Sequence, residues 1–300
     1  KPYSQKDYLE KLAELKVGSH ESIQKIKEEC RKFQLGLPVK YMHERHNVNV
    51  SGDYITNSSD VHHSFFVDEF KNCKYCFSMG LKPTKDCYDF CWGGQSELVY
   101  EAVATGINIG HSKFIYECWP DSFDVNYSAF CPGSSHLFGC MSLRNQKYCI
   151  LNKQYSKEEY EKLVPKVIQH MNEMPYVDKK GRAYKYGEFF PPELSPFAYN
   201  ETITHEYFPL TKEEALAQGH QWRDPDERQY RITVASEDLP DHVKDVRDSI
   251  LNEVISCAHK GKCNDLCTTA FRIIPGELEF LKSVGLPLPR LCPNCRHYQR

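Results

Sequence analysis

A series of related short segments between residues 57 and 152 constrains the fold of this chain more than any other feature. Each segment opens with polar residues and then places Tyr or Phe beside a small Ser, Cys, Ala or Gly. They recur at uneven steps of about 10 to 16 residues, a self-similarity that indicates a solenoid. Gly and Pro lie between them, which predicts a parallel β-helix with about two short strands per coil. The eight segments are residues 59–66, 71–78, 85–92, 96–103, 112–119, 124–131, 134–141 and 144–151.

We expect this β-helix to be right-handed, because strand twist makes parallel crossover connections right-handed in about 98% of cases. Small residues suit its crowded interior, where thiols pack as small hydrophobic groups. After the segments, Ser156 and Glu159 form a capping box, and Tyr160, Leu163 and Val164 follow at helical spacing. This helix is expected to cover the end of the solenoid, which would otherwise leave an open strand edge.

The sequence as a whole predicts a mixed α and β fold in five parts. Helical spacing of apolar residues such as Leu9, Leu12 and Leu15 indicates a pair of N-terminal helices packed on the next part of the chain. The parts are an N-terminal helical pair (1–38), a β-solenoid rich in cysteine and aromatic residues (39–155), a capping helix (156–173), a proline- and aromatic-rich arm with a short helix (174–246) and a zinc ribbon (247–300). The solenoid is thus a right-handed parallel β-helix flanked by helices, with the ribbon at the C-terminal end.

The zinc ribbon is predicted from two closely spaced cysteine pairs, Cys263-x3-Cys267 and Cys292-x2-Cys295. A β-prone run and a helix that begins at Pro275 separate the pairs. Four thiolates suit a tetrahedral structural Zn²⁺ site, and four protein ligands leave no open position for a catalytic water. Cys263 is the favoured partner of Cys267 because it is nearer in the sequence, with Cys257 as the alternative fourth ligand.

The solenoid segments contain a second set of cysteines at metal-ligand spacing, Cys73-x2-Cys76 and Cys87-x3-Cys91. A second metal site is one interpretation of this set. A ladder of stacked, buried cysteines is favoured over it, because similar positions of other segments carry Ser, Phe, Tyr or Ala. Disulfides are the third alternative.

Charge and composition restrict the function further. The 300 residues carry a net charge of −3, and no apolar run is long enough to span a bilayer. Fourteen cysteines at these spacings favour a reducing compartment, and hence the cytoplasm. The chain begins at Lys1 and has no signal-peptide pattern, so it is expected to be part of something longer. We find no catalytic constellation, and the run from Asp224 to Glu227 is expected to be a turn with solvated carboxylates.

Four longer motifs carry a family resemblance: residues 144–160, 189–202, 206–215 and 286–297. They resemble the signature of an uncharacterised bacterial zinc-ribbon family predicted from environmental genomes, and the match covers nearly the whole chain. Members carry repeated Asn-Cys-x-x-Cys segments before a capping helix, and some bear an automatic CoA-transferase label that nothing in this sequence supports. The resemblance implies the fold described above but no activity. This chain departs from the family where several repeats have Ser, Ala or Gly in place of Cys.

These observations favour a non-enzymatic, zinc-containing scaffold or binding protein with a protein partner or a second copy of itself. No small-molecule substrate and no membrane contact are expected. The first alternative is a nucleic-acid-binding protein, whose contacts would be the basic residues near the second cysteine pair, Arg290, Arg296, His297 and Arg300. The second is a carbohydrate-active β-helix enzyme. It would need clustered carboxylates, and the segments carry scattered ones such as Asp89, Glu101 and Glu117.

Overall fold

The computed structural model describes residues 2–224 and 230–300, without the side chain of Met79. Two compact units are present: residues 39–191 form one, and residues 1–38 together with 192–300 form the other. The expected arm (174–246) is therefore divided between the two units. Asp226 and Glu227 of the expected turn lie outside the described residues.

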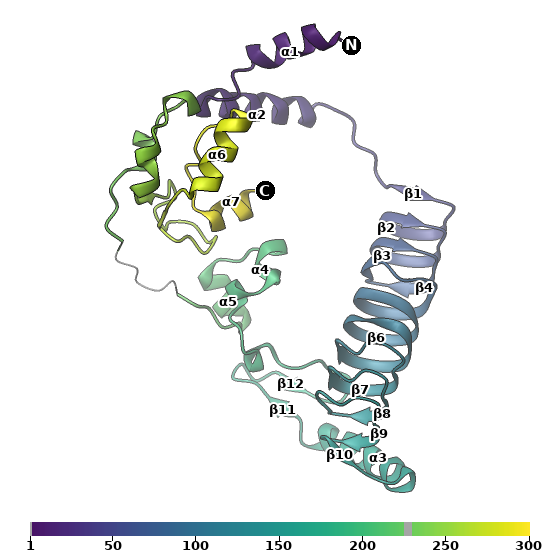
Figure 1. The fold of residues 1–300 in the computed structure, drawn as a ribbon. Coiled ribbons are helices and arrows are strands. Elements are labelled where there is room, and N and C mark those ends of the chain that lie inside the picture. The colour runs from purple at the N-terminus through teal and green to yellow at the C-terminus, as the bar shows by residue number, and fades with distance from the viewer. Residues whose placement is uncertain (1, 225–229) are drawn as a thin grey trace. The chain divides into compact units, whose positions relative to one another are not determined.

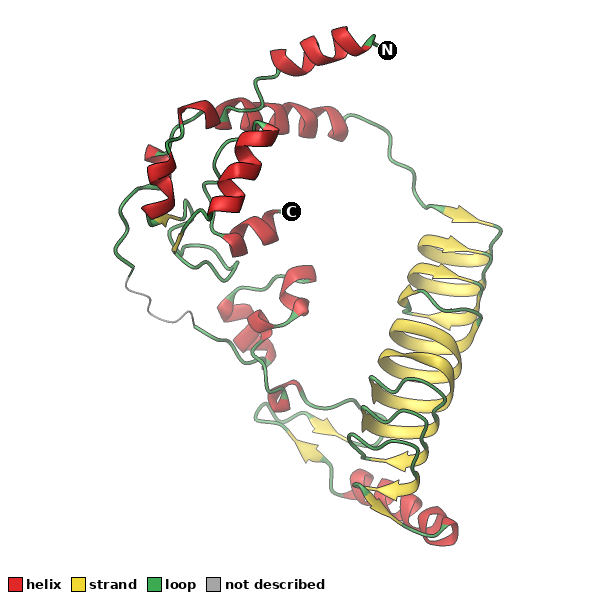
Figure 2. Ribbon diagram, in the orientation of Figure 1, coloured by secondary structure: helices red, strands yellow, loops and turns green. Residues whose placement is uncertain are grey.

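Residues 39–191 contain the β-solenoid, shown as stacked yellow strands in Figure 2 and labelled in Figure 1. Within the described part of the solenoid, the pairings from β1 to β9 are parallel, and β10 pairs with β9 in the antiparallel sense. The expected parallel β-helix is confirmed, whereas its right-handed sense stays a prediction. The strands are β1 (Glu44–Arg45), β2 (Val48–Thr56), β3 (Ser59–Asp68), β4 (Phe70–Lys74), β5 (Phe77–Met79), β6 (Thr84–Tyr116), β7 (Phe123–Ala129), β8 (Ser135–Phe138), β9 (Lys147–Ile150) and β10 (Lys153–Gln154).

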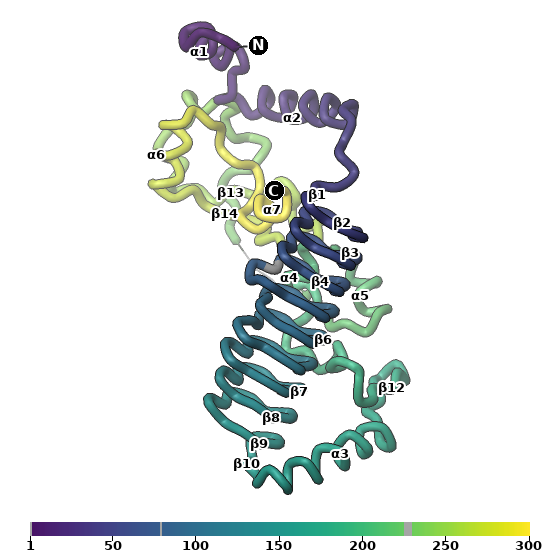
Figure 3. The backbone as a smooth tube through the Cα atoms, turned by 90° about the vertical axis from the view of Figure 1, so that its right-hand side faces the viewer, coloured from purple at the N-terminus to yellow at the C-terminus, as the bar shows by residue number. Residues whose placement is uncertain are grey.

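The coils of the solenoid are small. Ser59 pairs with Lys71, a step of 12 residues, and Phe70 pairs with Thr84, a step of 14. The resulting stack of narrow coils is visible along the backbone in Figure 3. Strand β6 runs unbroken through 33 residues and therefore through more than one coil. The expectation of about two separate short strands per coil is too simple, because extended backbone continues around much of each coil.

Within the coils, every third side chain points into the interior. Ser58, Val61, Ser64 and Val67 are each at most 3% exposed and fill one coil. The same spacing gives Phe70, Cys73 and Cys76 in the next coil. Along the later coils, a few interior residues are separated by more than three positions, and the series ends with Leu137, Cys140 and Cys149. A coil of about 12 residues therefore buries about four side chains, and its width leaves room mainly for small or single apolar groups.

This three-residue period depends on a left-handed backbone at the residue before each interior position. Asp60, His63 and Phe66 precede Val61, Ser64 and Val67, and their φ angles are 56°, 50° and 57°. Left-handed backbone costs roughly 1–2 kcal/mol for most L residues, and least for Asn and Asp. Asn and Asp occupy many of these positions. In neighbouring coils the side-chain amide of an Asn donates a hydrogen bond to the carboxylate of an Asp: Asn49 to Asp60, Asn72 to Asp86, and Asn108 to Asp121.

The helix α3 (Lys157–Glu173) covers the end of the solenoid at β9 and β10 (Figure 1). Ser156 and Glu159 form the capping box that the sequence predicts. Tyr160 is 5% exposed and packs with Phe138 and Ile150 of the last coils. Strands β11 (Tyr176–Val177) and β12 (Ala183–Tyr184) follow as a short antiparallel hairpin. Residues 186–190 then lie against the side of the solenoid, where Phe189 contacts the ring of Phe114.

The second unit has its own core, formed by Ile255, Ile273 and Leu288 with buried cysteines. The N-terminal helices are less packed than expected, because neither has a buried residue. The second of them is attached at its start, where the backbone N–H groups of His20 and Glu21 donate to Asp241. The helices and strands of the second unit are α1 (Gln5–Glu14), α2 (His20–Leu35), α4 (Ile203–Tyr207), α5 (Lys212–Gln218), β13 (Ile255–Ser256), β14 (Ala270–Phe271), α6 (Pro275–Val284) and α7 (Pro293–Gln299). Short 3₁₀ helices lie at 192–194, 199–201, 236–238, 243–245 and 248–252.

Candidate metal centre

A short β-hairpin positions Cys257 and Cys267, two of the clustered cysteines of the C-terminal unit. Strands β13 and β14 pair in the antiparallel sense, and Cys257 directly follows β13. Its backbone N–H donates to the carbonyl of Thr269 over 2.7 Å, which extends the ladder toward Cys267. Cys257 and Cys267 therefore face each other at the end of the hairpin, although they are ten residues apart in the sequence.

The start of α7 positions the other two cysteines. Cys292 is the N-cap residue of this helix, Pro293 is its first helical residue, and Cys295 lies within the first turn. Proline is favoured at this position because its missing N–H would have no helical partner. The side chain of Asn294 donates to the carbonyl of Leu266 over 2.7 Å, which ties the helix start to the loop before Cys267.

The sulfur atoms of Cys257, Cys267, Cys292 and Cys295 all lie within 4.8 Å of one another. The distance is 3.8 Å between the sulfurs of Cys257 and Cys295, and 4.0 Å between those of Cys267 and Cys292. Thiolates about 2.3 Å from a central Zn²⁺ would stand about 3.8 Å apart at the corners of a tetrahedron. Three of the cysteines are 0% exposed and Cys267 is 7% exposed. This buried cluster can hold a metal ion.

Backbone N–H groups point at these sulfurs. Thr268 donates to the sulfur of Cys292 over 3.5 Å, Thr269 to that of Cys267 over 3.4 Å, and Cys292 to that of Cys257 over 3.3 Å. Such bonds favour the thiolate form over the thiol, because a negatively charged sulfur is the better acceptor. The local fold therefore favours the ionised form that a metal binds.

Acidity differs between neighbouring thiols of the cluster. Burial acts to raise the pKa of Cys292, but hydrogen bonds from Thr268 and from the Cys295 backbone outweigh it and lower the pKa to about 6. Burial, followed by the hydrogen bond to Cys292, raises the pKa of Cys295. Several adjacent thiolates repel one another unless a cation lies among them. The cluster thus provides one thiolate readily, and a metal ion would allow the remaining thiols to ionise.

The structure separates the two alternatives for the fourth sulfur. Cys257 belongs to the buried four-sulfur cluster, whereas Cys263, which was favoured by its nearness to Cys267, does not. The sulfur of Cys263 lies 3.6 Å from that of Cys295 and belongs to a second group with His259 and Asp265. Cys257 reaches the cluster because the hairpin, and not the loop inside it, brings this residue opposite Cys267.

The solenoid cysteines have a different environment. Cys73, Cys76 and Cys87 are buried in the interior, whereas Cys91 follows the interior Phe90 and is partly exposed. Within the described residues, no group of three or more metal-binding atoms includes any of these four. The thiols of Cys73 and Cys87 donate to the carbonyls of Lys71 and Lys85, two residues earlier, over 3.2 Å in both cases.

Interior serines make the same bond. The hydroxyl of Ser64 donates to the carbonyl of His62, and that of Ser96 to Gly94. Ser and Cys therefore substitute for each other at interior positions as small donors, which supports the ladder interpretation. Burial raises the pKa of Cys140 and of Cys149, which keeps these two thiols protonated.

The four basic residues considered for nucleic-acid contact all have partners inside the unit. Arg290 donates to the carbonyls of Ser236, Leu239 and Pro240. The remaining contacts are an ion pair of Arg296 with Glu277, a contact of His297 with Glu206, and a hydrogen bond from Arg300 to the Arg296 carbonyl. These side chains stabilise the fold around the cysteine cluster.

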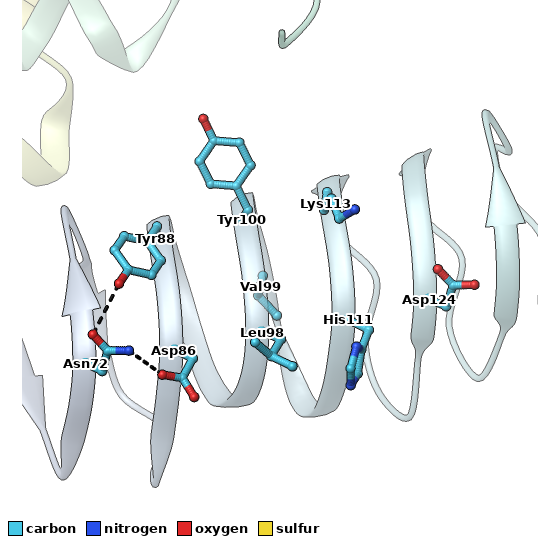
Figure 4. Close-up of a pocket in the computed structure, with 9 residues that line it drawn as sticks. All are labelled: Asn72, Asp86, Tyr88, Leu98, Val99, Tyr100, His111, Lys113 and Asp124. Carbon is cyan, nitrogen blue, oxygen red and sulfur yellow. Dashed lines mark hydrogen bonds between the residues drawn. The ribbon is translucent and has the colours of Figure 1, made fainter. Parts of the chain in front are cut away.

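An open groove of about 590 Å³ crosses successive coils of the solenoid (Figure 4). Tyr88 and Tyr100 line it with the side chains of Leu98, His111 and Lys113. In Figure 4, the strands that carry Leu98 and His111 lie between Asp86 and Asp124, the two carboxylates of the groove, and the usual spacing of β-strands then separates these carboxylates by about 14 Å. Glycoside hydrolysis needs two carboxyl groups about 5–9.5 Å apart, so this pair does not fit that chemistry.

The scattered carboxylates of the segments are partly brought together. Asp89 and Glu101 lie one coil apart, and Glu117 occupies a different position on its coil. Burial raises the pKa of Glu101, and the charge of Asp89 raises it further. Neither residue lines the groove.

No protein-family model matches the chain, and a search of curated proteins finds no match. Among residues 2–224 and 230–300, none of the helices is both long and apolar enough to cross a membrane.

Proposed function

We propose that this chain is a non-enzymatic scaffold or binding protein whose C-terminal unit is held together by a structural Zn²⁺. The observation that carries the proposal is the buried cluster of Cys257, Cys267, Cys292 and Cys295. Its four sulfurs supply a complete tetrahedral ligand set, and their burial leaves no position for water. A metal enclosed in this way stabilises a fold and does not activate a substrate.

Zinc is the metal that this donor set fits best. Tetrahedral sites with four sulfur ligands select Zn²⁺ or iron. Zn²⁺ has no redox chemistry and suits a site with purely structural contacts. The resemblance to a zinc-ribbon family points to the same ion. An iron-loaded centre would be coloured, whereas a zinc-loaded one absorbs no visible light.

The binding surface in this proposal is the solenoid with the segment that lies along it. Regular coils present long faces that suit extended partners. The exposed tyrosine and leucine side chains of the groove would provide apolar contacts, as would Phe190, which is 54% exposed. The occupant is proposed to be another protein chain or a second copy of this one. All fourteen cysteines are free, which supports a reducing compartment such as the cytoplasm.

The two alternative functions have weaker support. Nucleic-acid binding would require basic side chains that already bond within the unit. Carbohydrate chemistry would depend on Asp89 and Glu101, whose only support is that they lie one coil apart.

Elemental analysis of the purified full chain tests the proposal. We expect at least one equivalent of zinc per chain, and loss of that zinc in Cys292→Ser, because sulfur ligands hold the ion far better than a hydroxyl does. Cys30→Ser is the matched control, since Cys30 is exposed on α2 and lies outside the cluster. A folded C-terminal unit that contains no metal would overturn the proposal.

A further inference from the structure

A second group of metal-binding side chains lies directly beside the four-cysteine cluster. Ligand atoms of His259, Cys263, Asp265 and Cys295 all lie within 4.8 Å of one another. The sulfurs of Cys263 and Cys295 are 3.6 Å apart, and Nδ1 of His259 is 3.6 Å from a carboxylate oxygen of Asp265. The two groups share one residue, Cys295.

His259 provides an independent observation that points to a bound cation at this group. Its Nδ1 atom is buried and has no hydrogen-bond partner. The 3.6 Å to Asp265 is too long for a hydrogen bond. A buried nitrogen without a partner is costly, and most such atoms in proteins are satisfied. A cation placed among these ligand atoms would satisfy the nitrogen and the carboxylate together.

We propose that His259, Cys263, Asp265 and Cys295 bind a second divalent cation, with the sulfur of Cys295 bridging the two ions. The inference rests on the proposed function, because the bridge requires Cys295 to be a ligand of the first ion. The first ion has four sulfur ligands, and the second has two sulfurs, one nitrogen and one oxygen. Both sets are four-coordinate and contain the donor types that Zn²⁺ binds in proteins.

The second ion would reduce the negative charge of the centre. With one divalent ion, the four thiolates and the Asp265 carboxylate leave −3, because Cys263 is then a neutral thiol. With two divalent ions, five thiolates and the carboxylate leave −2. The proton released from the Cys263 thiol leaves to solvent.

The second ion would exchange more readily than the first. The side chains of His259 and Asp265 are 38% and 29% exposed, whereas the four cysteines of the first cluster are almost fully buried. A chelator therefore reaches the second position first. Two steps of metal loss are expected, and the first step leaves the core of the unit folded.

Native mass spectrometry of the full chain, prepared with Zn²⁺, tests the inference by counting bound ions. We expect two per chain in the parent protein and one in Asp265→Asn, which keeps the size of the side chain and removes its charge. Cys87→Ser is the matched control: it should keep both ions, because Cys87 lies in the solenoid interior. Substitution with ¹¹³Cd should give two NMR resonances, one from a four-sulfur site and one from a mixed site.

The outcomes separate the two proposals. A chain that binds no metal overturns both. One ion that persists in Asp265→Asn overturns the second site and leaves the first. Two ions, of which one is lost in Cys87→Ser, would place the second ion in the solenoid and also overturn the inference. If Asp265→Asn fails to fold, the number of ¹¹³Cd resonances in the parent protein decides: one resonance contradicts the bridged pair.

Discussion

The interior cysteines of the solenoid and the cysteines of the C-terminal unit differ in what their sulfur atoms contact. A solenoid thiol such as Cys87 donates to a carbonyl of its own strand. In the C-terminal unit, the sulfurs of Cys257 and Cys292 instead accept bonds from backbone N–H groups. Donation requires the proton and acceptance favours its loss, so the backbone favours a protonated, packed thiol at Cys87 and, at Cys257 and Cys292, the ionised form that a metal could bind.

Substitution of Arg290 tests whether the basic residues near the cysteine cluster stabilise the fold. Its replacement in Arg290→Met leaves the carbonyls of Ser236, Leu239 and Pro240 without this donor. We expect the free energy of unfolding of this unit to fall by about 1–3 kcal/mol, the typical effect of leaving a buried acceptor unsatisfied. Urea-dependent hydrogen exchange on peptides from 233–300 measures it.

Arg300→Met is the control, because the Arg300 side chain is exposed and donates a hydrogen bond to the Arg296 carbonyl alone among the described residues. Its effect on unfolding should be small. Equal stability of Arg290→Met and the parent chain, together with a salt-dependent loss of nucleic-acid affinity, would favour the nucleic-acid function.

Single residues also show which parts of the candidate metal centre could be predicted from the sequence and which could not. The structure places Cys292 and Cys295 in one cluster, as the sequence predicts, because a spacing of three residues at a helix start fixes both positions locally. The choice between Cys257 and Cys263 depended on the pairing of β13 with β14, which the sequence does not specify. The grouping of His259 and Asp265 with Cys263 and Cys295 was not predicted, although both residues lie inside the same cysteine loop. Metal-binding residue types concentrated in so short a segment were the available signal.

Among elements, the solenoid was predictable as a repeat but not in its geometry. The aromatic residues that mark each segment recur along the sequence at steps of uneven length. The regular feature is instead the interior series, such as Ser58, Val61, Ser64 and Val67, which repeats every three residues. A period of three belongs to neither an ordinary strand nor an α-helix, and in this chain it comes with left-handed backbone at about one residue in three. Patterns based on periods of 2 and 3.6 therefore could not reveal it.

Leu98 tests the role of left-handed backbone in the coils. Its φ is 55°, and it is 43% exposed in the groove, so packing contributes little there. Asn adopts this conformation readily, whereas the branched side chain of Val resists it. We expect Leu98→Asn to exceed Leu98→Val in free energy of unfolding by about 1 kcal/mol. Urea unfolding followed by circular dichroism compares the two variants. Equal stability would contradict the strained backbone at this position.

On the scale of the whole molecule, two units with separate cores should respond separately to the loss of metal. The solenoid is stabilised by the interior packing of its coils and by α3, and no metal-binding group of three or more atoms lies in its described part. The core of the other unit includes the four clustered cysteines themselves. Small metal-binding domains commonly fold only with their ion, because the site has no counterpart in the unfolded chain.

Hydrogen–deuterium exchange of the full chain, with and without a strong chelator, tests this account most directly. We expect peptides from 255–300 to lose protection when the metal is removed, and peptides from 58–150 to keep it. Added Zn²⁺ should restore the protection. Unchanged exchange in 255–300 after complete removal of metal would contradict a structural metal centre, because the cysteine cluster would then be stable as buried thiols alone.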